Sequence, residues 1–515
     1  MAANQVKVDQ STATNTLSSA LYVIGRESTF GFLGAFGTLA LAFVTKMLLA
    51  RALSPNNFGL LLIGQTIVAL ALPLAQLSLP DAVVRFVGLY GAEPTLTRSK
   101  GVLLSSLKLG GPTAVLVTIG LGLSASIIAN EIYRQAELTS VLVILALAMP
   151  FNTVADMLAA AYRGLGQLWV KVAFVDLGRA LWVVLAIGSL LALNANSLMA
   201  VVGIYLTASI GSAVLTSRLF MRSRRWRVQP AQTPLGDLLR YSFPLLGVSL
   251  LTWPMSSIPL LLGSTVSLQA VTYYNLAMAL GNFIYMPVSA IELAALPVWA
   301  GWISQGLVPN LRRAYKFSAR WCLVAGSIVF VPLFLCPGDV LTILYGPNYK
   351  EAAPVMQTIA ALILLNAATG PNDSLLRAFG DTRQILLARL VAGSSLLAVG
   401  AVLVPSWGMP GALVALGVSN VLSLCVYVIW LWAQRNIHPL DAPYLKTLSA
   451  GALALLMSGM AQGYLVEGMG RIAATVLLYS VVLFGLLTAL RVFTPQDRRV
   501  LKSAYRLIGN TLAKV

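Results

Sequence analysis

The sequence predicts an all-α polytopic membrane protein with 14 transmembrane helices, and three observations support this. Of its 515 residues, 58% are apolar and only 10% are charged, whereas about a quarter of the residues are charged in a soluble protein. The apolar residues form long runs, close to the ~20 residues that a helix needs to span a bilayer. Lys and Arg outnumber Asp and Glu by 35 to 17, as expected where cytoplasmic loops collect basic residues. A water-soluble fold is excluded, and with it the nucleic-acid partner that a net charge of +18 would otherwise suggest.

Fourteen apolar segments follow one another along the chain, separated by short polar connections. They cover 30–50, 58–80, 102–128, 138–161, 168–193, 197–220, 238–262, 274–298, 321–337, 352–376, 385–404, 411–432, 444–463 and 471–490.

The basic residues support this number of spans. When the termini and loops are assigned alternately to the two sides, 29 of the 35 lysines and arginines fall on one side. If one span were missed or added, every later loop would be assigned to the opposite side, and the basic residues would no longer gather on one side. Since Lys- and Arg-rich loops stay in the cytoplasm, we predict cytoplasmic N- and C-termini. The exceptions are Arg51, Arg134, Lys350 and Arg471 on the other side, and Lys46 and Arg179 within spans.

An internal repeat with a spacing of 214 residues predicts two parallel six-helix units. Five pairs of identical residues keep this spacing without gaps, and each unit starts from the cytoplasmic side. Parallel repeats of this kind are related by an axis along the membrane normal, with the substrate path between them. The pairs are Arg26 and Arg240, Arg98 and Arg312, Asn152 and Asn366, Arg163 and Arg377, and Gly166 and Gly380.

The repeat also predicts the domain organisation, in which the last two helices are an appendage to the two lobes. The segments are a cytoplasmic N-terminal segment (1–29), an N-lobe (30–220), a basic linker (221–237), a C-lobe (238–432), two extra helices (433–490) and a basic C-terminal segment (491–515).

Three stretches resemble signatures of a known family. They are 49–60 (LARALSPNNFGL), 344–349 (LYGPNY) and 376–383 (LRAFGDTR). They are similar to bacterial polysaccharide flippases of the O-antigen and exopolysaccharide type. These proteins form the polysaccharide transporter family, within the superfamily of multidrug, oligosaccharidyl-lipid and polysaccharide exporters. The likeness covers about residues 25–433.

The resemblance implies a V-shaped pair of six-helix bundles that alternate access across the bacterial inner membrane. It implies a substrate in which an oligosaccharide is linked to undecaprenyl diphosphate and moves from the cytoplasmic to the periplasmic leaflet. Such transport serves the biosynthesis of surface polysaccharides, including lipopolysaccharide O-antigen, capsule and exopolysaccharide. A polysaccharide polymerase and a chain-length regulator are the implied protein partners, and no cofactor is implied.

The fourth and tenth spans carry comparable polar stripes. Asn152, Asp156 and Arg163 lie within ~40° of one another on an ideal helix, and the tenth span repeats this with Asn366, Gly370, Asp373 and Arg377. Arginine suits a diphosphate because its planar fork hydrogen-bonds phosphate through two N–H groups. Alternatively, each Asp pairs locally with the Arg seven or four residues later.

Further candidates for substrate binding lie in the eighth span and at span ends. Asn275, Asn282 and Ser289 recur every seven residues and predict either a groove for sugar hydroxyls or polar contacts between helices. The arginines expected to contact the diphosphate are Arg26, Arg85, Arg163, Arg179 and Arg377. For Arg179, an ion pair with Asp176 on the same helix is the alternative.

The sequence contains no ATP-binding motif, so an ion gradient is the expected energy source. The candidate ion-coupling residues are Asp156, Glu292 and Asp373, because charged groups inside spans usually face a cavity or a partner. The cysteines Cys322, Cys336 and Cys425 lie in or at the ends of apolar runs, so no metal site is expected.

Three other functions are less compatible with the sequence. A multidrug exporter of the same superfamily is expected to carry an acid in its first helix, where the only charge here is Lys46. The Ser-Arg signature of lipid II flippases is absent from 31–34. A membrane-embedded glycosyl-transfer enzyme would need an Asp-x-Asp pair or a large catalytic loop, and neither occurs, so we predict that the chain is not an enzyme.

Overall fold

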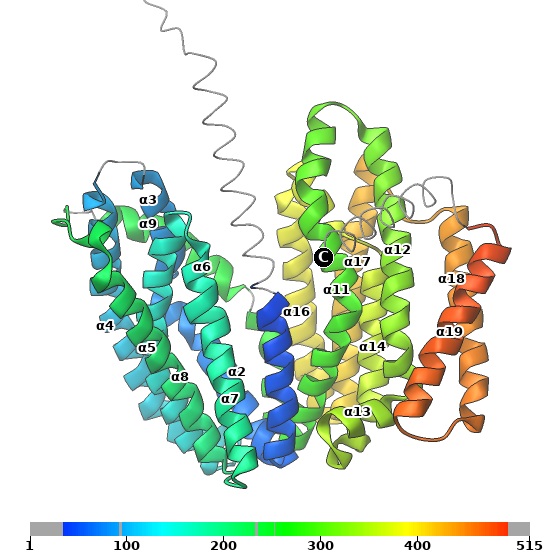
Figure 1. Ribbon diagram of the computed structural model, residues 1–515, viewed down its shortest axis with the longest axis horizontal. Coiled ribbons are helices and arrows are strands. Elements are labelled where there is room, and N and C mark those ends of the chain that lie inside the picture. Colours follow the sequence, from blue (N-terminus) through cyan, green and yellow to red (C-terminus); the bar gives the residue numbers. More distant parts are fainter. Residues whose placement is uncertain (1–33, 35, 92–94, 232–234, 252, 493–515) are drawn as a thin grey trace, which may run out of the picture. The chain divides into compact units, whose positions relative to one another are not determined.

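The computed structural model describes residues 34, 36–91, 95–231, 235–251 and 253–492, which form helices and turns with no strand among them (Figure 1). These residues divide into two compact units. The first runs to Ser256 and includes Ser267–Gln269. The second comprises Ser257–Val266 and the chain from Ala270 onward.

The first unit starts with a helical segment at 36–52. Its helix α5 contacts α2, α3, α4 and α8 and so forms the centre of the unit. A π-helical stretch, Lys171–Leu177, joins α6 to α7. The helices are α2 (Pro55–Gln76), α3 (Leu79–Tyr90), α4 (Thr97–Ile127), α5 (Glu137–Gly164), α6 (Leu168–Val170), α7 (Gly178–Ala192), α8 (Leu198–Arg222) and α9 (Leu235–Leu250).

In the second unit, α12 contacts α14, α18 and α19, and α16 packs closely along α17. A Cβ atom on Gly411 of α17 would lie only 2.1 Å from the carbonyl oxygen of Leu403 on α16, so a glycine is required at this approach. The helices are α10 (Ser257–Thr265), α11 (Leu268–Ser304), α12 (Val308–Leu335), α13 (Pro337–Tyr345), α14 (Ala353–Ala368), α15 (Asn372–Phe379), α16 (Thr382–Trp407), α17 (Met409–Arg435), α18 (Ala442–Ala461) and α19 (Met469–Ala489).

The all-α multi-pass fold is confirmed. The described residues contain 13 helices that are long and apolar enough to cross a membrane, and they match the second to fourteenth predicted spans. The helix at 36–52 matches the described part of the first predicted span, which begins outside the described residues. The total of 14 therefore stays a prediction.

Two of the predicted spans are interrupted. The seventh is divided into α9 and α10 by a 3₁₀ turn at Trp253–Ser256, where Pro254 cannot donate a backbone hydrogen bond. The tenth is divided into α14 and α15, and Gly370 lies in the break with a φ of +78°. Asn366 and Asp373 are therefore on different helices, and the predicted continuous stripe of the tenth span is wrong.

The internal repeat is visible in the way two helices end. Gly166 and Gly380 both have a positive φ, of 69° and 78°, a conformation that favours glycine. The amide of Gly166 donates to the carbonyl of Arg163 at 3.0 Å, and that of Gly380 donates to the carbonyl of Arg377 at 3.0 Å. The 214-residue spacing therefore places the same glycine turn after both helices, as expected of a repeat.

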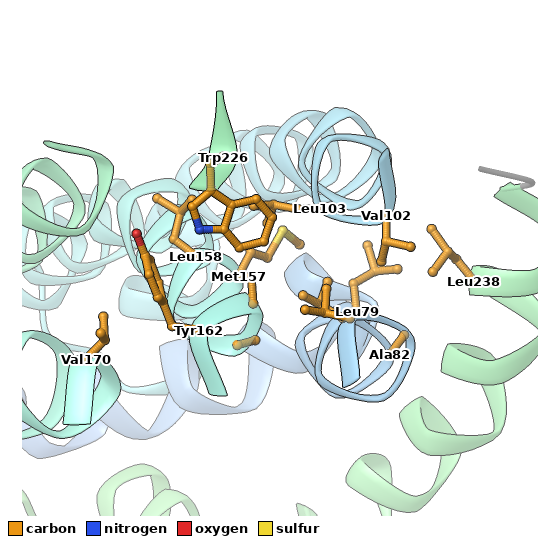
Figure 2. Close-up of a cluster of buried hydrophobic side chains, with 14 residues drawn as sticks. Leu79, Ala82, Val102, Leu103, Met157, Leu158, Tyr162, Val170, Trp226 and Leu238 are labelled. Carbon is orange, nitrogen blue, oxygen red and sulfur yellow. The ribbon is translucent and has the colours of Figure 1, made fainter. Parts of the chain in front are cut away.

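The basic connection after α8 is anchored in the core of the first unit. Figure 2 shows Trp226 with its ring over Met157 and beside Leu103. Trp226 is 2% exposed, and its ring lies 6.1 Å from that of Tyr162 and 5.2 Å from that of Phe220. The part of the predicted basic linker that carries Trp226 thus packs against the core of the first unit.

Replacing Trp226 with Ala should remove about 3–5 kcal/mol of stability, because the cavity left by a buried aromatic ring is only partly refilled. Unfolding of the purified protein in detergent measures this loss. Trp407→Ala is the control, because Trp407 is 60% exposed. Equal destabilisation by both changes would contradict the anchoring role of Trp226.

Candidate functional site

A cavity in the first unit brings together polar groups from four spans. It has a volume of about 380 Å³ and lies between the helix at 36–52, α2, α7 and α8. Lys46 and Arg179 contribute two cationic groups, and Asp176 contributes one carboxylate. Gln65 and Tyr205 add neutral hydrogen-bonding groups to a lining that is otherwise mostly apolar, and its cationic side chains outnumber its anionic ones.

The π-helical stretch before α7 determines how these charges pair. Lys171 donates to both carboxylate oxygens of Asp176 at 2.9 and 2.8 Å. The alternative considered for Arg179, an ion pair with Asp176, is therefore wrong, because five-residue spacing in the wider π turn brings Lys171 to Asp176 instead. Within the described residues, the Nε and Nη2 atoms of Arg179 are buried and have no hydrogen-bond partner.

Asp156 lies near Arg179 in the interior of the first unit. Its Oδ2 atom accepts a hydrogen bond of 2.8 Å from Nε2 of Gln76, at the end of α2. The positive charge of Arg179 acts on Asp156, which thus has a cationic neighbour from another helix. The side-chain oxygen of Asn152, one turn earlier in α5, is buried without a hydrogen-bond partner among the described residues.

The other arginines predicted for the first unit lie elsewhere. Arg163 is 3.8 Å from Asp81 of α3, so its expected alternative pairing with Asp156 is wrong. Asp156 and Arg163 are seven residues apart, which is almost two turns of α5, whereas Asp81 of α3 lies beside Arg163. Arg85 lies over the ring of Tyr241, 4.4 Å from its centre. Arg26 lies outside the described residues.

The second unit collects acids and bases around the start of α15. The Oδ2 atom of Asp373 is 3.1 Å from Nη2 of Arg389 and 3.6 Å from Nη2 of Arg377. The expected local pair of Asp373 with Arg377 is confirmed. Glu292 of α11 experiences the charges of Asp373, Arg377 and Arg389, and its Oε1 atom is buried without a hydrogen-bond partner among the described residues. Two predicted coupling acids thus share one cluster.

The break between α14 and α15 positions Asp373 in this cluster. The hydroxyl of Tyr315 is 2.8 Å from the carbonyl oxygen of Thr369 and 2.6 Å from Oδ1 of Asn372. Asn372 in turn donates to the hydroxyl of Thr369 at 2.8 Å, and Tyr444 donates to the carbonyl of Ala368 at 2.7 Å. These bonds replace part of the backbone ladder that the break removes.

The three predicted asparagines of the second unit have different surroundings. Asn366 donates to Asn420 of α17 at 3.1 Å, and Asn275 donates to the carbonyl of Val271 in its own helix at 3.0 Å. Asn282 is exposed. Asn366 is thus engaged between helices, which is the structural alternative for such residues.

Three residues of the cavity and of the charge cluster were not predicted from the sequence. Arg389 lies in α16, the helix after Asp373, and it is one of the basic residues that the sequence assigns to the cytoplasmic side. Tyr205 and Tyr427 lie within apolar spans, and Tyr427 makes a side-chain hydrogen bond with Asp373. Only the packing of helices that are distant in the sequence brings these residues to the cavity and to the cluster.

The comparison of the sequence with known families agrees with this architecture. A model described as "Polysaccharide biosynthesis protein" matches residues 24–301, more than half of the chain, and the chain belongs to this family. The family resemblance based on the three sequence motifs is thereby confirmed. Stage V sporulation protein B of Bacillus subtilis (strain 168) is 20% identical over 420 residues, which are 75% of this chain and 79% of that protein.

Solved structures with the same fold are membrane transporters. The lipid II flippase MurJ in an inward closed conformation has a TM-score of 0.68 at 11% identity, over 89% of this chain and 97% of that one. An inward-facing multidrug resistance MATE family transporter of the MOP superfamily has a TM-score of 0.62 at 12% identity, over 77% and 94%. The chain is thus a multi-pass membrane protein with a flippase-like transporter fold.

Replacing Tyr315 with Phe should lower stability by about 1–3 kcal/mol, because it leaves buried acceptors at the helix break without a donor. Thermal unfolding in detergent checks this change. Tyr464→Phe is the matched control, because Tyr464 is 92% exposed and should lose nothing. A neutral effect of Tyr315→Phe would show that its hydroxyl does not support the break.

Proposed function

We propose that this protein flips an undecaprenyl-diphosphate-linked oligosaccharide from the cytoplasmic to the periplasmic leaflet for the biosynthesis of a surface polysaccharide. The observation that carries the proposal is the cationic cavity of the first unit, in a chain that belongs to the polysaccharide biosynthesis family. A basic lining suits a diphosphate, and charged groups at membrane depth are costly unless they serve a function or find a partner.

Arg179 is the strongest candidate for a contact with the diphosphate of the substrate. Two of its nitrogen atoms are buried without a hydrogen-bond partner among the described residues, so no hydrogen bond there offsets their desolvation. Arg179 also lines the cavity, where its positive charge would attract an anionic oxygen. Lys46 would add a second positive charge from another helix. In the same proposal, Arg85, Arg163 and Arg377 meet the substrate nearer the span ends, and Asn152, Asn275, Asn282 and Asn366 offer hydrogen bonds to sugars.

The acid and base cluster of the second unit suits ion coupling. Glu292 lies near Asp373 and two arginines, and its Oε1 atom has no hydrogen-bond partner among the described residues. Protonation of Glu292 would change the charge balance around Asp373, which already contacts Arg377 and Arg389. We assign the coupling step to Glu292 and Asp373, with Asp156 as the acid of the first unit.

The same observations disfavour the export of cationic drugs, because Lys46 and Arg179 would repel such cargo. In this proposal both termini are in the cytoplasm of a bacterium, the protein lies in the inner membrane, and the polymerase and chain-length regulator act after it. The class of substrate, a lipid-linked oligosaccharide, is proposed without a particular sugar composition.

Lys46→Met and Arg179→Ala should each lower the rate of flipping by about tenfold or more, because each removes an interaction with the diphosphate worth roughly 1.5–3 kcal/mol. Flipping is measured in proteoliposomes with a fluorescent undecaprenyl-diphosphate oligosaccharide. Arg227→Ala removes an exposed positive charge outside the cavity and should leave the rate unchanged. Wild-type flipping by both cavity variants, correctly inserted, would refute the assigned binding site.

Glu292→Gln should uncouple transport from an imposed proton gradient, because the amide can neither release nor take up a proton. The rate with and without the gradient would then be the same, whereas the wild-type rate would rise with it. Glu467→Gln, which removes an acid that is 71% exposed, is the control and should respond like the wild type. A gradient response retained by Glu292→Gln would remove Glu292 from the coupling mechanism.

A further inference from the structure

Another cavity, with a more polar lining, lies at one end of the first unit, separate from the cavity around Arg179. It has a volume of about 570 Å³ and is found where α3 and α5 end and the basic connection after α8 begins. Its lining includes Gly88, Gly91 and Gly164 from the ends of α3 and α5, and Arg224, Arg225 and Val228 from the basic connection.

The basic side of this cavity is held in place by contacts within the unit. Trp226, directly after the two arginines, is buried in the core. The carbonyl of Val228 accepts a hydrogen bond of 2.8 Å from Lys100, and the amide of Ala231 donates to the carbonyl of Thr97 at 3.0 Å. The backbone that carries Arg224 and Arg225 is therefore positioned before any ligand arrives.

The rest of the lining comes from the ends of α3 and α5 and from the start of α4, and it includes three glycines together with Thr95, Leu96 and Leu165. A Cβ atom on Gly164 would lie 2.8 Å from the carbonyl oxygen of Val84, and one on Gly91 would lie 2.8 Å from that of Val87. Close packing at the ends of α3 and α5 thus requires small residues there. The glycines of this close contact and the two arginines of the basic connection line the same cavity.

The two arginines are available for a ligand. Both are exposed, and neither takes part in an ion pair within the part of the chain that the structure describes. Two adjacent guanidinium groups offer N–H donors in the planar arrangement that phosphate oxygens accept. The cavity also lies at the ends of the membrane spans α5 and α8, where lipid headgroups are the most abundant source of phosphate.

We propose that this cavity binds the phosphate group of a membrane lipid. The ligand is either an anionic phospholipid of the bilayer or a polyprenyl carrier with its phosphate or diphosphate, since both present the same chemistry at the membrane surface. The site is distinct from the cavity around Lys46 and Arg179, and the proposal does not depend on which substrate crosses the membrane. A lipid bound here would fasten the basic connection to the end of α3.

The test uses the full-length protein in a non-ionic detergent, with the unfolding temperature followed as lipid is added. Phosphatidylglycerol, undecaprenyl diphosphate, phosphatidylcholine and inorganic diphosphate are compared. An anionic lipid should raise the unfolding temperature more than phosphatidylcholine does. The Arg224→Ala/Arg225→Ala variant should need at least about tenfold more of this lipid for a half-maximal shift.

Two variants separate a defined site from general attraction. Arg227→Ala removes a charge from the same connection without touching the cavity lining and should bind like the wild type. Arg224→Lys/Arg225→Lys keeps the charge but loses the planar fork, and its affinity should fall between those of the wild type and the Ala variant.

The outcomes distinguish the sources of phosphate. A shift with phosphatidylglycerol alone assigns the site to the bilayer, and a shift with undecaprenyl diphosphate alone assigns it to the carrier. A shift with inorganic diphosphate and neither lipid would overturn the assignment to a lipid. Equal loss of binding in Arg227→Ala and in the double Ala variant would overturn the site itself.

Discussion

Backbone hydrogen bonding inside the bilayer is the constraint on which the rest of this structure depends. An amide or carbonyl group without a partner costs several kcal/mol in hydrocarbon, so a membrane helix is interrupted only where the protein supplies substitutes. The break between α14 and α15 meets this condition through the hydroxyls of Tyr315 and Tyr444 and the side chain of Asn372. The position of Asp373, and with it the charge cluster of the second unit, follows from that substitution.

The apolar spans and the repeat could be predicted from the sequence because both are local or periodic properties. Thirteen predicted spans coincide with described helices, and the spacing between Gly166 and Gly380 identified two equivalent caps. The interruption at Gly370 was not predicted, because its hydrogen-bond donors come from α12 and α18. Composition shows that a span is apolar but does not show whether its backbone is continuous.

The candidate site was predictable in its residue types and less so in its pairings. Asp373 and Arg377 are four residues apart, and helix geometry brings them together. Asp156 and Arg163 lie on the same face of α5, yet Gln76 bonds to the first and Asp81 lies beside the second. These partners come from α2 and α3, so only tertiary packing selects them. The π-helical turn that pairs Lys171 with Asp176 likewise has no signal in the spacing of the charges.

The repeated cap at Gly166 and Gly380 has a consequence for how the two units could diverge. The hydrogen bonds of each cap join backbone atoms, so the cap itself does not depend on the side chain directly after the glycine. In the first unit that residue is Gln167. In the second it is Asp381, whose carboxylate receives hydrogen bonds from Arg435 and Trp430 and so ties the turn to α17. A duplicated turn can in this way keep its shape while one copy acquires a new attachment.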